Sequence, residues 1–155
     1  MDTPTEDAGI YARESPYLDR YVQFGEVGDR DISVSFPTQP EDDVGSDHSL
    51  LDRIEDYLGG AEDEFDDVTV GLTVPTEQRS VLEAVQKIPY GEDGTVEQVA
   101  QMAGMDRNDQ EALTQIRESL AANPVPLLIP DHRVRDGPSG APPPVEQKLR
   151  AIEEL

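Results

Sequence analysis

Residues 123–134 constrain the fold of this chain more than any other segment does. Three prolines interrupt the segment, and because proline fixes φ and lacks an N–H donor, no regular helix can run through it. The apolar run 127–129 predicts a short buried strand. Asp131, His132 and Arg133 follow directly, so ionisable side chains begin where a buried segment ends. A buried apolar run and three ionisable side chains therefore follow one another in a single short segment.

The composition restricts the chemistry that this chain can carry out. The chain has 0 Cys, which excludes disulfides, zinc–thiolate centres and any reaction on a thiol. His48 and His132 are the only two histidines, and the acids near them are no denser than elsewhere in this acidic chain. We therefore predict neither a metal site nor a cofactor.

The charge of the chain is strongly negative, with 34 acidic residues against 12 basic ones and a net charge of −22. Residues 1–75 alone carry a net charge of −16, and ten of the 12 basic residues are arginines. A surplus of carboxylates with few lysines is typical of proteins in a salt-loaded cytoplasm, here of haloarchaeal type. A disordered acidic interaction protein is the alternative, but the periodic apolar patterns argue against disorder throughout.

The length and the start of the chain predict where the protein works. At 155 residues it has room for one ordinary domain or two small ones. No apolar run approaches the roughly 18 residues that span a bilayer, and the first residues lack the basic and apolar parts of a secretion signal. We therefore expect a soluble, cytoplasmic monomer without a membrane partner.

The first half predicts a small sheet with one helix. Residues 1–15 are polar and predict a frayed end. The alternating runs 21–24 and 32–36, with Gly28 and Asp29 between them, predict a β-hairpin. A helix is expected from a cap at Ser46 to Leu58, and a third strand at 68–73. Together these elements predict a small α/β domain that covers residues 1–74.

The second half, residues 75–155, predicts a helical domain. Thr76 and Thr95 are expected to cap two helices, at 76–88 and 96–102, which end before Pro89 and Gly104. Apolar residues at helical spacing predict two more helices, at 110–122 and 145–155. The second and third of these, joined by a polar turn, have the outline of a helix-turn-helix or winged-helix module.

Several strings in this half resemble one family of DNA-repair proteins. Residues 88–92 read Ile-Pro-Tyr-Gly-Glu, 99–104 read Val-Ala-Gln-Met-Ala-Gly, and 123–134 contain Asn-Pro-Val-Pro and Pro-Asp-His-Arg. These strings are similar to those of the 6-O-methylguanine-DNA methyltransferase family across residues 76–155. Upstream only the order of elements is similar. The resemblance implies an α+β fold, with a small ribonuclease-H-like N-terminal domain and a C-terminal winged-helix domain.

The resemblance also implies a site and its defect. In the family, the residue before His-Arg is a cysteine, whose thiolate, made by a water–His pair, takes the alkyl group from a flipped-out guanine. Here that acceptor position is Asp131, with His132 in the place of the base and Asn123 at the turn that braces the segment. We therefore predict that the methyltransferase reaction is absent. Without the thiol, the structural reading is a buried His132 and an Arg133 paired to a carboxylate.

The residues expected to contact DNA depart from the family pattern. Thr114 falls where the recognition helix carries an arginine that fills the space of the extruded base, and Val96 falls where a tyrosine crowds the phosphate. Arg117, one turn further on, is an alternative wedge. Ser139 and Gly140 lie in the loop that closes over the base in the family. Three prolines stiffen this loop, so a rigid cover over an unused cavity is an equal interpretation.

Three roles for Asp131 remain open: a structural hydrogen-bond acceptor, a pocket wall in a lesion-binding protein, or a nucleophile that forms a hydrolysable alkyl ester. The predicted function is that of a non-catalytic alkyltransferase-like protein. It would bind alkylated guanine in double-stranded DNA by base flipping and flag it for repair, with a nucleotide-excision-repair protein as a further partner. The alternatives are a degenerate member that serves as a protein-interaction module without DNA binding, and an Asp-dependent dealkylase.

Overall fold

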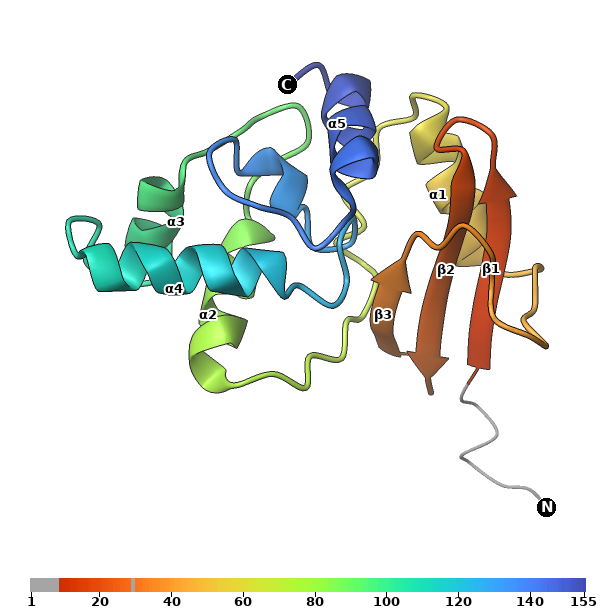
Figure 1. The fold of residues 1–155 in the computed structure, drawn as a ribbon, viewed down its shortest axis with the longest axis horizontal. Coiled ribbons are helices and arrows are strands. Elements are labelled where there is room, and N and C mark those ends of the chain that lie inside the picture. Colours follow the sequence, from red (N-terminus) through yellow and green to blue (C-terminus); the bar gives the residue numbers. More distant parts are fainter. Residues whose placement is uncertain (1–8, 29) are drawn as a thin grey trace.

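The computed structural model describes residues 9–28 and 30–155, and its architecture is α+β, as predicted. The first half forms a three-stranded antiparallel sheet in the order β1-β2-β3 (Figure 1). Its strands are β1 (Gly9–Ser15), β2 (Arg20–Val27) and β3 (Arg30–Ser35). Buried side chains from the sheet, such as Phe24 and Val34, belong to the core.

Strand β1 corrects the prediction of a frayed end as far as residue 15; residues 1–8 lie outside the described residues. The strand pairs with β2 along its whole length, with Tyr11 opposite Phe24. Their rings stack with centroids 5.3 Å apart, and Ala12 is buried on the other face. The polar composition hid the strand, because cross-strand ring contacts can hold a strand that has few apolar residues.

The predicted hairpin is present and longer than expected. Its strands extend to Val27 and Arg30, which pair directly, so residues 28 and 29 alone connect them. Gly28 has a φ of 65°, the left-handed conformation that glycine adopts without strain in such connections. Asp29, the other residue predicted for this turn, lies outside the described residues.

Helix α1 (Ser49–Leu58) packs its apolar stripe into the core, as predicted. Its N-cap is His48 and not Ser46: the backbone N–H of Leu50 donates to His48 Nδ1 at 3.0 Å. Residues 68–73 form no strand, which corrects a second prediction. Alternate side chains there, those of Val68, Val70 and Leu72, do pack against the core, and this packing explains the alternating pattern.

The second half contains the four predicted helices: α2 (Thr76–Val85), α3 (Val96–Met102), α4 (Gln110–Ala121) and α5 (Pro143–Ile152). Helix α3 has the predicted cap at Thr95, whose hydroxyl accepts from the Gln98 N–H while the Gln98 side chain accepts from the Thr95 N–H. Helix α2 ends three residues earlier than predicted, and Pro75 rather than Thr76 stands at its N-cap. Helix α5 begins two residues earlier, since prolines fit a first helical turn.

Residues 127–129 are buried but form a turn instead of the predicted strand. The Ile129 N–H donates to Val125 O at 2.9 Å, and Leu127 has a φ of 82°. A strand pairs through backbone N–H donors, and Pro126 and Pro130, which flank these residues, have no N–H to donate. The turn leads into a short 3-10 helix, η2 (Asp131–Arg133), which carries the predicted polar residues.

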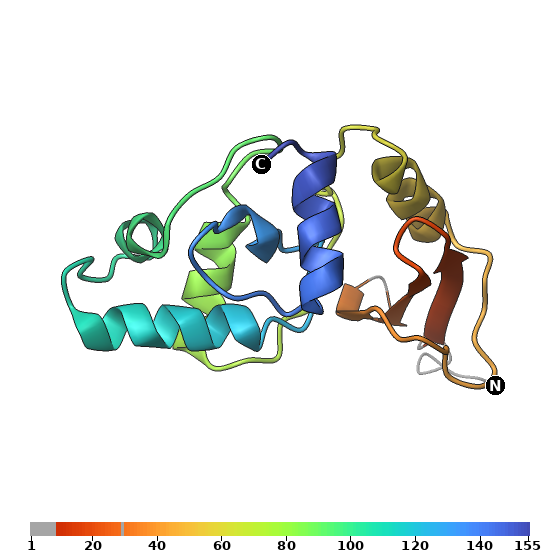
Figure 2. The same cartoon turned by 45° about the horizontal axis from the view of Figure 1, so that its top comes forward.

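The two halves share one cluster of buried apolar side chains, and α5 lies between the sheet and helices α2, α3 and α4 (Figure 2). At the seam, the Val34 N–H of β3 donates to the carbonyl of Pro124 at 2.8 Å. The division into domains at residue 75 stays a prediction. Within the described residues, no helix is both long enough and apolar enough to cross a membrane.

Candidate functional site

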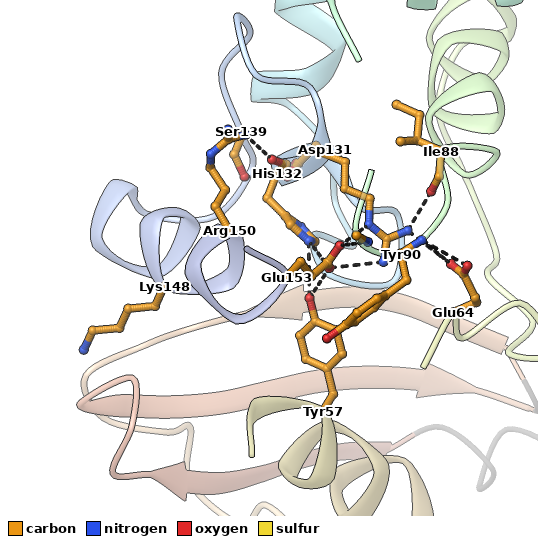
Figure 3. Close-up of polar contacts among 12 residues, drawn as sticks. Tyr57, Glu64, Ile88, Tyr90, Asp131, His132, Ser139, Lys148, Arg150 and Glu153 are labelled. Atoms are coloured by element: carbon orange, nitrogen blue, oxygen red, sulfur yellow. Dashed lines mark hydrogen bonds and ion pairs between the residues drawn. The ribbon is translucent and has the colours of Figure 1, made fainter. Parts of the chain in front are cut away.

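The Asp131 carboxylate is enclosed by hydrogen-bond donors and has 0% of its surface exposed. Ser139 Oγ donates to Oδ1 at 2.5 Å, a contact drawn in Figure 3. The second oxygen, Oδ2, accepts from Asn123 Nδ2 at 2.9 Å and from the backbone N–H of Gly140 at 2.8 Å. All three donors are uncharged, and within the described residues no arginine or lysine forms an ion pair with Asp131.

Asn123 braces the turn that precedes this carboxylate, as the sequence predicted. Its Nδ2 also donates to Ile129 O at 3.1 Å, and its Oδ1 accepts from the Val125 N–H at 3.0 Å. The backbone of Gly140 approaches so closely that a Cβ there would lie 2.4 Å from Asn123 O. Only glycine fits this position without moving the loop or the brace.

His132 lies beside Asp131 and is fully buried, which agrees with the structural reading of the sequence. Its Nε2 is 2.7 Å from Glu153 Oε2, so the ring donates to this carboxylate (Figure 3). The hydroxyl of Tyr57, which reaches across from α1, donates to the same oxygen. His132 Nδ1 is buried and has no hydrogen-bond partner among the described residues.

Arg133 is paired to carboxylates, also as predicted. Its Nε and Nη2 donate to the two oxygens of Glu153 at 2.8 and 3.1 Å. Its Nη1 donates to the carbonyl of Ile88 at 2.6 Å and to Glu64 Oε1 at 3.2 Å. The guanidinium carbon lies 5.7 Å from the centre of the Tyr90 ring, within range of a cation–π contact. The buried arginine therefore joins η2 to the C-terminal end of α5 and to the turn that follows α2.

The pKa values of the two buried acids, Glu153 and Asp131, are shifted in opposite directions. Arg133 and His132 donate to Glu153, and their hydrogen bonds outweigh the cost of burial and lower its pKa to about 2. Burial dominates at Asp131 and raises its pKa, although Ser139, Gly140 and Asn123 counteract part of the rise. The pKa of the half-buried Glu146 on α5 is raised as well, first by burial and then by the charge of Asp131.

The sequence of the chain matches a known family over its helical half. The family model described as 6-O-methylguanine DNA methyltransferase, DNA binding domain, matches residues 76–152. A methylated-DNA–protein-cysteine methyltransferase of Methanopyrus kandleri is 37% identical over 127 residues, which are 79% of this chain and 92% of that protein. The chain belongs to this methyltransferase family. One from Methanothermobacter thermautotrophicus is 39% identical over 94 residues, 59% of this chain and 50% of that protein.

Solved structures of methyltransferases share the fold of this chain. Mycobacterium tuberculosis OGT in complex with DNA covers 95% of this chain and 91% of its own, at 22% identity and a TM-score of 0.73. The O6-methylguanine-DNA methyltransferase of Pyrococcus kodakaraensis strain KOD1 covers 96% of this chain and 99% of its own, at 16% identity and a TM-score of 0.65. The family and the α+β fold predicted from the sequence are therefore confirmed.

This member of the methyltransferase family has no cysteine, so it lacks the acceptor that the family name describes. No three His, Asp or Glu side chains in the described part of the chain are grouped as metal ligands. The geometry around Asp131 is that of a satisfied hydrogen-bond acceptor, because three donors already occupy its oxygens. The expectation that Asp131 does no methyl transfer rests on the chemistry of carboxylates, which are weaker nucleophiles than thiolates.

The structure brings most of the predicted site residues together and leaves three apart. Six of them form one cluster, which consists of Asp131 at the acceptor position together with Asn123, His132, Arg133, Ser139 and Gly140. Thr114 and Arg117 are exposed on α4. Val96 is 0% exposed, and its N–H donates to Asp136 Oδ1 at 2.7 Å. A contact from the Val96 side chain to a phosphate would require that side chain to leave the core.

Glu153, Tyr57 and Glu64 also belong to the site, and none of them was predicted. A signal for Glu153 exists: Val145, Leu149 and Glu153 are spaced by four residues, and all three are buried, so an acid continues the apolar stripe of α5. A buried acid needs a partner, and an arginine after the proline-rich segment is a natural one. Tyr57 carries no such signal, because a tyrosine on an apolar stripe is an ordinary core residue.

Proposed function

We propose that this chain is a non-catalytic alkyltransferase-like protein, which binds alkylated guanine in double-stranded DNA and keeps it available to another repair pathway. One observation carries the proposal: Asn123, His132 and Arg133 are held in an ordered buried network around an acceptor position that contains a carboxylate. A chain that had only lost its activity would not need to hold this network, whose charged members are costly to bury.

The proposed binding mode uses α4 as the recognition helix. Mycobacterium tuberculosis OGT is known in complex with DNA, and this chain shares its fold. Thr114 and Arg117 are exposed on α4, and Arg117 is long enough to act as the wedge that replaces an extruded base. At molar salt counterion release contributes little, and a chain with a net charge of −22 gains no overall attraction to phosphate, so hydrogen bonds and stacking must supply the affinity.

A paired binding assay tests this function. Two labelled duplexes, one with a single 6-O-methylguanine and one with guanine at the same place, are titrated in molar KCl. We expect the lesion duplex to bind at least about tenfold tighter, the ratio that 1.4 kcal/mol of base contact supplies. Arg117→Ala should weaken this binding, and Arg30→Ala on β3 is the matched control. Equal and negligible binding of both duplexes would contradict the proposal.

Replacing the acceptor residue tests whether the remaining site is competent. His132 donates through Nε2 to Glu153, which leaves the buried Nδ1 free to act as a base toward a neighbouring group. We therefore expect Asp131→Cys to take up one labelled methyl group per chain from methylated DNA, whereas the wild type and Asp131→Ser take up none. No transfer by a folded Asp131→Cys chain would mean that the base does not reach the site.

A second candidate function is a protein-interaction module without DNA binding. The observation in its favour is the charge of the helix pair: residues 96–121 contain five acids and two bases, and one of these bases, Arg107, pairs with Glu97. The same duplex titration separates the two functions. Failure to bind either duplex at any KCl concentration, together with a defined protein that co-purifies from a high-salt lysate, would favour the second.

A further inference from the structure

Two of the residues expected to meet a flipped base are already engaged by the chain itself. The hydroxyl of Ser139 and the backbone N–H of Gly140 both donate to the Asp131 carboxylate. Hydrogen-bond donors in this loop are the groups that a guanine oxygen would need. A carboxylate offers about four acceptor sites to such donors, whereas a thiol is only a weak acceptor. The substitution at the acceptor position therefore gives the chain an internal competitor for its own base-binding donors.

We propose that Asp131 is a latch that holds residues 137–141 closed over the acceptor position, so that a base enters only when Ser139 and Gly140 exchange the carboxylate for the base. The proposal rests on the lesion-binding function above and adds the regulation of the same site. The latch is defined by the hydrogen bonds from Ser139 and Gly140 to Asp131, with Asn123 as the fixed third donor that orients the carboxylate.

The packing of the loop shows that the closed latch separates Asp131 from solvent. Asp131 is 0% exposed and Ala141 5% exposed, so no base can contact the carboxylate while the loop stays in place. The Ala141 N–H donates to Ser139 Oγ at 3.0 Å, which fixes the hydroxyl so that it points its proton at Asp131. The close approach of Gly140 to Asn123 O leaves no slack between the loop and the brace. Opening must therefore move residues 139–141 together.

The charges around the latch indicate how it is held. The hydrogen bonds come from uncharged donors, and the charged groups that interact electrostatically with the carboxylate are His132 on η2 and Glu146 on α5. Arg150 donates to His132 O at 2.7 Å and does not pair with Asp131. A buried hydrogen bond of this kind is screened far less by salt than a surface ion pair is. The latch should therefore remain closed in molar KCl, where the surface charges of the protein are screened.

Amide hydrogen exchange tests the latch without DNA. In molar KCl, Asp131→Ala should speed exchange at Gly140 and Ala141 by at least about tenfold, because a hydrogen bond to a charged acceptor is lost. Ser139→Ala breaks the latch from the other side and should speed exchange at the same amides. Glu146→Gln is the matched control, because it removes a nearby half-buried acid and leaves the three donors in place. Unchanged exchange in both folded latch variants would overturn the proposal.

The duplex titration then tests whether the latch controls entry. If it does, Asp131→Ala binds the 6-O-methylguanine duplex about tenfold tighter than the wild type, because the donors no longer have to leave a carboxylate. Faster exchange with unchanged lesion affinity would overturn the gating role. Faster exchange with no binding of either duplex by any variant would instead contradict the proposed function, while the latch itself would stand.

Discussion

Asp131 and Glu153 are both buried carboxylates, yet their pKa values are shifted in opposite directions. Asp131 is 0% exposed and Glu153 is 4% exposed. Asp131 receives hydrogen bonds from an amide, a hydroxyl and a backbone N–H, and its pKa is raised. Glu153 receives hydrogen bonds from Arg133, His132, Tyr57 and the N–H of Gly91, and its pKa is lowered to about 2. Burial alone therefore predicts neither behaviour.

The difference teaches what a cation adds to a set of hydrogen bonds. Neutral donors compensate part of the cost of removing the Asp131 carboxylate from water, whereas His132 and the guanidinium of Arg133 together overcompensate it at Glu153. Glu153 is thus a fixed anion that organises His132 and Arg133. Burial disfavours the charged form of Asp131, so its hydrogen-bond partners should be easier to exchange than those of Glu153.

Glu153→Gln should have the largest effect on stability. The substitution keeps the shape of the side chain but leaves Arg133, which is 3% exposed, with Glu64 as its remaining ion-pair partner. Removing one member of a buried pair costs about 3–5 kcal/mol, so we expect a loss of that size in the free energy of unfolding. Urea unfolding in fixed KCl measures it. A loss below about 1 kcal/mol would mean that Arg133 is better solvated than its burial indicates.

The free energy of unfolding at acid pH should depend on the protonation of the same carboxylate, that of Glu153. Because the folded pKa of Glu153 lies below its usual value of 4.5, its contribution is complete above that value and is lost as the pH falls toward 2. The loss is on the order of 3 kcal/mol. Urea unfolding from pH 6 to pH 3 should therefore show the difference between wild type and Glu153→Gln shrinking with falling pH. A difference that stays constant would contradict the assignment.

Asp131→Asn should have a smaller effect and the opposite dependence on pH. Asparagine keeps one oxygen for the donors and removes a charge that burial disfavours, so we expect a destabilisation below about 1.5 kcal/mol at pH 7. Because the folded pKa of Asp131 lies above 3.8, the carboxylate subtracts stability at neutral pH, and this penalty disappears as the pH falls toward 3.8. The deficit of Asp131→Asn should therefore grow between pH 7 and pH 4. A shrinking deficit would contradict this.

Tyr57→Phe should have the smallest effect of the series. The variant removes one hydroxyl donor from Glu153, whose oxygens keep His132, Arg133 and Gly91. We expect a loss of about 1 kcal/mol in the free energy of unfolding. Tyr17→Phe is the matched control, since its exposed hydroxyl lies at the protein surface and should change stability by less than about 0.5 kcal/mol. Equal effects of both variants would show that Tyr57 does not support Glu153.

Local signals in the sequence predicted much of the helical half. The capping box at Thr95 involves residues three apart, so it could be predicted without tertiary structure. Asn123, Asp131, His132 and Arg133 were predicted as residues of one site because segment 123–134 resembles the family's active-site segment. The cap at His48 could not be predicted, because histidine is not among the usual N-cap residues, and its ring is held here by contacts with Tyr11 and Phe24.

The partners of the site could not be predicted because they come from distant segments. Glu153 lies 20 residues beyond Arg133, and Tyr57 reaches the site from α1 in the other half of the chain. The donors Ser139 and Gly140 were predicted as residues of the site, but their engagement by Asp131 depends on the path of a loop that the sequence does not specify. Strand prediction at 68–73 failed similarly, since pairing requires a neighbour.

The hydrogen bond from Val34 to Pro124 has a consequence for how this protein can be divided. It ties β3, the edge strand that faces the helical half, to the first residue after the bracing asparagine. Severing the chain near residue 75 would strip that carbonyl of its donor and Glu153 of a hydroxyl, so the helical fragment would inherit a damaged framework. The N-terminal half therefore stabilises the site around Asp131 and Glu153, and the two halves should be expressed and altered together.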